Sequence, residues 1–252
     1  MNNQQLLNIA SRLGNSMQRN GAETFRIEDS IARVLAALGA TDINVFVINS
    51  CFMVSMKADE GTVVSEIRRC TEKSTDLYKI DRLNTLCRRI CSEKMDYDSI
   101  IAEIDDIESK KAYSFIVKLI GFTIISAGFC FLFGGRLLEL AAALIVSVIV
   151  YPLIYSMDRL STGIFFKNII ASGLIALLTI LLSAFLFEVQ IDTVIIGTFM
   201  NLVPGVALTT SMRDIIAGDL ISGKNTLTEA LVIALGMALG SGLVIASLGF
   251  LM

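Results

Sequence analysis

The sequence predicts a polytopic α-helical membrane protein, with about five transmembrane helices behind an N-terminal soluble α+β domain. Apolar residues make up 54% of the 252 residues, and the mean hydropathy is +0.69. Charge is unevenly distributed, because residues 1–111 hold fifteen of the 21 basic and seventeen of the 24 acidic side chains. This division indicates two solvents, so we expect a cytoplasmic domain at 1–111 and a transmembrane domain at 112–252.

Residues 1–111 alternate between helical and strand-like patterns. Ile27, Ile31 and Val34 recur at helical spacing, and Phe52, Val54 and Met56 alternate as in a strand. The predicted elements are helices at 3–18 and 23–38, strands near 43–48, 52–56 and 62–68, and helices near 77–90 and 100–107. A small α+β domain of ordinary size follows from this order.

The remainder contains five apolar stretches, each close to the ~20 residues that a membrane-crossing helix needs. They are about 115–133, 137–156, 164–187, 193–210 and 227–251. Basic residues favour the cytoplasmic side. Lys110 and Lys111 precede the first stretch, Arg159 lies after the second and Arg213 after the fourth. We therefore expect a cytoplasmic N-terminus and a C-terminus outside.

Composition also argues against several functions. The chain has no His, which removes imidazole-based triads and metal sites. Nucleophile elbows and phosphate-binding loops are missing as well. A net charge of −3 without a basic run argues against nucleic acid. We expect no enzyme activity, no cofactor and no metal.

The segment Asn201-Leu202-Val203-Pro204-Gly205 interrupts the fourth apolar stretch. Pro204 lacks an N–H donor and Gly205 loosens the backbone, so we expect a broken helix here. Unpaired backbone groups at membrane depth must face protein or a water-filled cavity, and broken helices often form the substrate sites of transporters. A purely structural kink is the alternative.

Arg213 and Asp214 follow this break, with Gly218 and Gly223 placed for a turn or for close packing. These charges are candidates for substrate binding or translocation, although charges near a membrane interface cost little. Gly236 and Gly240 form a G-x-x-x-G pair, for which generic helix packing is the simplest interpretation.

A polar cluster also surrounds Gly21 in the N-terminal domain, formed by Glu23, Arg26 and Glu28. It hints at a polar site. The simpler interpretation is a helix junction, with Gly21 as a C-terminal cap and solvated or locally paired charges beside it.

Two of these motifs together resemble the threonine/serine exporter family. Residues 20–28 (NGAETFRIE) are similar to its N-terminal signature, and residues 201–205 (NLVPG), with Asp214, Gly218 and Gly223, to its membrane signature. The likeness covers nearly the whole chain, which is similar in length and span number to the large subunit of the family's split two-subunit form. The bacterial succinate-export pair is one such system. Asn20 replaces the usual histidine of the first motif, so no imidazole role can transfer.

This resemblance implies a secondary-type exporter in the bacterial inner membrane, moving threonine, serine or a dicarboxylate such as succinate. A second small membrane subunit of the same family would be its partner, and a homo-oligomer stays open. In this interpretation Pro204 and Gly205 open backbone groups to the solute and Asn201 hydrogen-bonds it. Arg213 attracts its carboxylate, and Asp214 carries protons or holds Arg213. A scaffold for a transport subunit and a membrane-anchored hydrolase are the alternatives.

Overall fold

The computed structural model describes residues 1–252 except 58–60, 71–73, 112, 161, 186–188 and 250–252. Its contacts divide the chain into two units, and each contains residues from both parts of the sequence. The N-terminal unit comprises Met1–Lys111 and Leu208–Leu227. The membrane unit comprises Ala112–Ala207 and Thr228–Met252.

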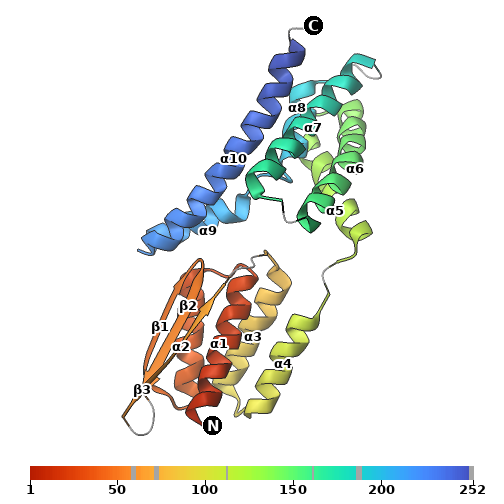
Figure 1. The fold of residues 1–252 in the computed structure, drawn as a ribbon. Helices are drawn as coiled ribbons and strands as arrows, with labels where there is room; N and C mark the ends of the chain where they lie inside the picture. Colours follow the sequence, from red (N-terminus) through yellow and green to blue (C-terminus); the bar gives the residue numbers. More distant parts are fainter. Residues whose placement is uncertain (58–60, 71–73, 112, 161, 186–188, 250–252) are drawn as a thin grey trace. The chain divides into compact units, whose positions relative to one another are not determined.

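The N-terminal unit contains a three-stranded antiparallel sheet and four helices in its first segment (Figure 1). The order along the chain is α1 (Asn3–Arg19), α2 (Thr24–Ala37), β1 (Thr41–Ile48), β2 (Cys51–Lys57), β3 (Val63–Arg69), α3 (Leu77–Ser92) and α4 (Tyr97–Ser109). These bounds agree closely with the ranges expected from the sequence. That the unit is soluble and cytoplasmic stays a prediction.

Local sequence explains where these helices begin and end. Asn2 and Gln5 form a capping box at the start of α1, where the Gln5 N–H donates to Asn2 Oδ1 at 2.7 Å. Gly21 follows α1 with φ of +88°, a conformation that suits glycine. Asp76 caps α3 by accepting from the Lys79 N–H.

The core of this unit lies between the sheet and its helices. Helices α1 and α2 pack on the sheet, and α3 and α4 pack against α1 and α2 from behind. The inward face of β2, with Phe52, Val54 and Met56, is buried as its alternation predicts. Gly14 of α1 gives room for the Phe52 ring, since a Cβ there would lie 2.7 Å from Phe52 Cζ.

The membrane unit is a helical bundle built around a short central helix. Four described helices are long and apolar enough to cross a membrane, and they are α5 (Phe115–Leu132), α6 (Leu137–Arg159), α7 (Ile164–Phe185) and α10 (Leu220–Gly249). The short helix α8 (Ile191–Phe199) contacts α5, α6 and α7. Small residues bring these helices together, and a Cβ at Gly197 of α8 would lie 2.7 Å from the Cys130 backbone.

Two predictions about the membrane helices are corrected here. The expected single span at 193–210 is wrong, because α8 ends at Phe199 and α9 (Gly205–Ile216) begins only after Pro204. The break itself was expected. The last helix begins at Leu220, not 227, so the polar link expected at 211–226 is mostly helical. The predicted ends at 187 and 251 and the C-terminus lie outside the described residues.

Candidate functional site

The broken helix places Asn201 at one end of α8. Its side-chain amide donates to Ser126 Oγ at 2.7 Å and to the Phe122 carbonyl at 3.2 Å, both on α5. Ser126 is fully buried and donates in turn to the Phe122 carbonyl. The chain turns after Phe199, whose carbonyl accepts from the N–H groups of Leu202 and Val203. Asn201 therefore fixes the broken segment to α5.

Asn201 also lines a cavity of about 390 Å³ within the membrane unit. The other side chains come from α5 and α6, and they are Lys118, Gly121, Phe122, Ile125, Tyr151, Tyr155 and Asp158. The aromatic wall is mutually packed, with 5.3 Å between the ring centroids of Phe122 and Tyr151. A cation, a carboxylate and an amide thus share one aromatic cavity.

Charges in this cavity are partly paired. Asp158 accepts from Lys167 Nζ at 2.7 Å, and the Arg159 guanidinium lies 5.0 Å from the centre of the Tyr155 ring. Lys118 is exposed, as suits a lysine whose side chain extends from a membrane helix toward the interface. Its role as a cavity residue was missed, because a lone lysine near a span's end carries no pattern.

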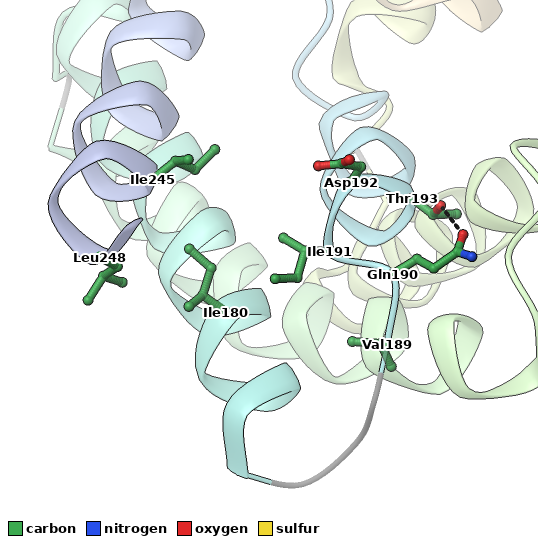
Figure 2. A pocket seen from close by; sticks show the side chains of 8 residues that line it. All are labelled: Ile180, Val189, Gln190, Ile191, Asp192, Thr193, Ile245 and Leu248. Atoms are coloured by element: carbon green, nitrogen blue, oxygen red, sulfur yellow. Dashed lines mark hydrogen bonds between the residues drawn. The ribbon is translucent and has the colours of Figure 1, made fainter. Parts of the chain in front are cut away.

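A second cavity, of about 550 Å³, lies at the opposite end of α8 (Figure 2). Gln190, Asp192 and Thr193 provide its polar groups, and Figure 2 shows the Thr193 hydroxyl turned toward the Gln190 amide. Its apolar side chains are Ile180, Val189, Ile191, Ile245 and Leu248. A single short helix thus has a polar-lined cavity at each of its ends.

Glu139 supports the second cavity from α6. Only 5% of this residue is exposed, and its carboxylate accepts from the Arg136 N–H at 2.8 Å and the Gln190 N–H at 3.1 Å. No sequence prediction included Glu139, because Arg136 is not one of the Ser, Thr, Asp or Asn residues that mark a helix N-cap.

The remaining candidate charges gather in the N-terminal unit. Arg213 of α9 forms an ion pair with Glu23, which also pairs with Arg26 at 3.3 Å. The carboxylate that receives the Arg213 hydrogen bond is Glu23, and the role of Asp214 in holding Arg213 stays a prediction. The polar cluster beside Gly21 and the charges after the break, 190 residues apart, thus form one site.

Asp214 is buried in this site, with 3% of the residue exposed. Among the described residues its Oδ1 atom has no hydrogen-bond partner. Burial, with the carboxylates of Asp219 and Glu23 nearby, raises the pKa of Asp214 to about 6, against a smaller lowering by Arg213. A buried carboxyl with such a pKa can change its charge near physiological pH.

Glu28 and Asn49 complete the contacts of this site. Glu28 accepts from the Val47 N–H of β1 at 2.8 Å, and burial is the main cause that raises its pKa. The Asn49 amide, in the β1–β2 turn, donates to Thr226 Oγ1 at 2.8 Å in α10. The β1–β2 turn and the start of α2 therefore both hold the segment 208–227.

Glycines shape the two helix contacts. Gly218 has φ of +94° between α9 and α10, and a Cβ at Gly223 would lie 3.0 Å from the Ser211 carbonyl oxygen. Gly236 and Gly240 face α7, where a Cβ at Gly236 would lie 3.0 Å from the Phe165 carbonyl oxygen. The G-x-x-x-G pair thus packs within this chain. Pro204 and Gly205 remain candidates by position alone.

The described residues contain no group of three or more Cys, Asp or Glu side chains placed to hold a metal ion. The five cysteines are free thiols, and three of them are buried, namely Cys70, Cys87 and Cys130. The site geometry is therefore that of polar cavities and an ion-pair cluster.

Comparison with known proteins assigns the chain to a family. Residues 8–248 match the ThrE family, described as "Putative threonine/serine exporter". A curated relative from Mycobacterium tuberculosis (strain ATCC 25618 / H37Rv), "Probable threonine/serine exporter", is 25% identical over 243 residues. That alignment covers 95% of this chain and 46% of the relative, so the chain spans about half the relative's length. No solved structure matches the chain. With a family match across nearly all of its residues and a helical membrane unit, the chain belongs to the threonine/serine exporter family.

Proposed function

We propose that this chain is one component of a secondary-type exporter that carries small carboxylate-bearing solutes, threonine or serine first among them, out of the bacterial cytoplasm. Family membership supports export across a membrane. The single observation that carries the proposal is the cavity that Asn201 lines at the broken helix.

The chemistry of this cavity suits an amino acid. The Lys118 ammonium can attract a carboxylate, and the Asp158 carboxylate can attract an ammonium group. The Asn201 amide and the tyrosine hydroxyls can hydrogen-bond a hydroxyl side chain. A second carboxylate, as in succinate, would meet Asp158, and the nearby Lys167 is already paired with that residue. We therefore place hydroxy amino acids ahead of dicarboxylates.

The two cavities at the ends of α8 support a route along this helix. With the predicted orientation, the cavity of Asn201 faces the cytoplasm and the cavity of Asp192 faces outside. Helix α8 has nine residues, so it spans only about 13 Å. Helix α8 and the first residues of α9, as far as Ala207, would then serve as a fifth, interrupted crossing beside the four long helices.

A second membrane subunit completes the proposal. This chain spans about half of its curated relative, which supports a further subunit as the source of the other half. A separate small subunit of the same family would supply them, as in the split form that the sequence resembles.

The test is efflux of labelled threonine from cells that express the chain with its proposed partner. Asn201→Ala should lower the efflux rate about tenfold, because it removes the proposed hydrogen bond from the Asn201 amide to the solute, worth roughly 1.4 kcal/mol. Asn168→Ala is the matched control, since Asn168 is also a membrane-helix asparagine that donates to a backbone carbonyl, at 2.7 Å from Ile164 O.

Unlabelled serine should compete in this assay and succinate should not. Efflux at the wild-type rate by Asn201→Ala at equal expression would remove this cavity from the route. Succinate competing as well as serine would overturn the proposed solute class.

A further inference from the structure

The N-terminal unit holds a helical hairpin that is continuous with the membrane unit. The hairpin is the second half of α9, the turn at 217–219 and the first turns of α10, all within Leu208–Leu227. Glu23 binds it through Arg213, and Asn49 binds it through Thr226 and, at 3.5 Å, the Ser222 carbonyl. Two separate parts of the unit, the start of α2 and the β1–β2 turn, thus contact one hairpin.

This hairpin is internally rigid. The Asp219 N–H donates to the Asp214 carbonyl at 2.8 Å and the Gly218 N–H to the Ile215 carbonyl at 3.1 Å. Gly223 allows α10 to approach α9 closely, since a Cβ there would lie 3.0 Å from both Ser211 O and Ile215 N. A force that Asn49 exerts on α10 through Thr226 is therefore transmitted to α9.

Helix α9 connects the hairpin directly to the broken segment. It runs for twelve residues from Gly205, which follows Pro204, to Ile216 in the hairpin. A helix of this length extends about 18 Å as one stiff element. Its first residues follow the broken segment directly in the chain.

Asp214 is the unusual residue in this arrangement. It is fully enclosed, and Oδ1 has no partner among the residues described. The charged groups that face it are Asp219 from the turn, Glu23 from the start of α2 and its own neighbour Arg213. Two negative carboxylates and one positive guanidinium thus surround Asp214, and the guanidinium is already paired with Glu23. The negative charge of an ionised Asp214 is therefore poorly compensated.

We propose that the N-terminal unit is a proton-sensitive clamp on the α9–α10 hairpin, in which Glu23 holds Arg213 and protonation of Asp214 tightens the grip. The clamp acts on α9, which directly follows the broken segment at 200–204 in the chain. Its consequence for efflux rests on the proposed transport function. The clamp itself does not, because it is a property of contacts within the N-terminal unit.

The direction of the pH effect follows from linkage. The pKa of Asp214 is raised from 3.8 to about 6 in the closed arrangement, so the closed state binds the proton more tightly than the open state does. Protonation therefore stabilises the closed state fully below about pH 3.8, and this stabilisation is lost as the pH rises through about 6. Above that value Asp214 is ionised in both states and the effect levels off.

Hydrogen exchange followed by mass spectrometry on the full chain in detergent tests this clamp. After correction for intrinsic exchange rates, the opening equilibrium constant of peptides from 208–227 should increase about tenfold between pH 5 and pH 7.5. Asp214→Asn should keep these peptides protected at both pH values. Asp81→Asn, an exposed carboxylate change in α3, is the matched control and should behave like the wild type.

A charge exchange tests the ion pair in the same experiment. Arg213→Glu should open peptides 208–227, and adding Glu23→Lys should restore their protection. Peptides from α4 serve as the folding check, because they lie away from the hairpin contacts. A pH dependence that persists in Asp214→Asn, or a failure of the exchanged pair to restore protection with α4 intact, would overturn the clamp.

Efflux separates this proposal from the previous one. If wild-type cells export no threonine, the transport function fails while the exchange data still decide the clamp. If export occurs but its pH profile is the same in Asp214→Asn and the wild type, the clamp does not act on transport.

Discussion

Replacing Gly240 by alanine is the sharpest test of the membrane unit's packing. Gly240 lies where α10 meets α7, and an added Cβ would overlap Ile169 O and Ser172 Oγ and lie 2.8 Å from the Ile169 carbonyl carbon. Carbon atoms at rest lie about 3.5–4.0 Å apart, so the two helices must separate by roughly 1 Å. Backbone atoms form most of this contact, and a rotamer change cannot relieve it.

The separation affects more than one contact. Gly173 of α7 lies against the Gly240 carbonyl, because a Cβ added at Gly173 would lie 3.2 Å from that oxygen, so both helices approach through glycine. Overpacking of this kind costs about 1–3 kcal/mol. For a chain of this length each kcal/mol lowers Tm by about 2–4 °C, so we expect a loss of about 4–8 °C at 2 kcal/mol.

Thiol reactivity gives a suitable assay, because the chain has no Trp and Cys130 is fully buried in the membrane unit. Unfolding of the purified chain in detergent would be followed as temperature rises by maleimide modification of Cys130, distinguished from the other four thiols by peptide mass spectrometry. Gly242→Ala is the matched control, since no atom lies within 4 Å of a Cβ at that position. A Gly240→Ala midpoint within 1 °C of the Gly242→Ala midpoint would refute the packing argument, with ~1 °C corresponding to less than about 0.5 kcal/mol.

Three further predictions concern single groups. Gly218→Ala should weaken the hairpin turn by about 1–2 kcal/mol, because φ of +94° is unfavourable for alanine. Limited proteolysis at 217–219 should then be faster. Gly128→Ala is the control, since Gly128 lies in a helix with open space around its Cβ position. Burial raises the pKa of the Cys87 thiol to about 12, so at pH 8 maleimide should modify the exposed Cys91 well before Cys87. Peptide mass spectrometry would measure the two labelling rates, and equal rates would contradict the burial of Cys87. Glu139→Ala should lower the free energy of unfolding by roughly 2–3 kcal/mol, because two backbone donors lose a charged acceptor. Glu139→Gln retains an acceptor and should lose less. Equal thermal unfolding midpoints for the two variants would show that these hydrogen bonds contribute little.

The sequence predicted most elements because their signals are local. Alternation in 52–56, helical spacing from Ile27 onward and the apolar stretches all reflect burial of one face or of a whole element. The break after Phe199 was also local, since Pro204 cannot continue the hydrogen bonding of a helix. The start of α10 at Leu220 was missed because polar residues such as Lys224 and Asn225 interrupt the apolar pattern without ending the helix.

The candidate sites depend on contacts that no local pattern contains. Asn201 was chosen for its place beside the proline, but its bond to Ser126 joins positions 75 residues apart. The ion pair between Arg213 and Glu23 could not be predicted for the same reason, because the two residues are distant in sequence and near in space. Asp219 received no attention, although it is one of the two carboxylates that face Asp214. Spacing can identify candidate side chains, whereas pairing requires the fold.

The discontinuous make-up of the N-terminal unit sets an order for biosynthesis. Its first 111 residues leave the ribosome early, but the segment from Leu208 to Leu227 that binds Glu23 and Asn49 emerges only after α5 to α8 have been made. At typical translation speeds of about 5–20 residues per second, this delay is on the order of 10 s. Insertion of the first three long helices therefore precedes completion of the N-terminal unit, and a ribosome-stalled chain shorter than 208 residues would display an unfinished surface at the start of α2.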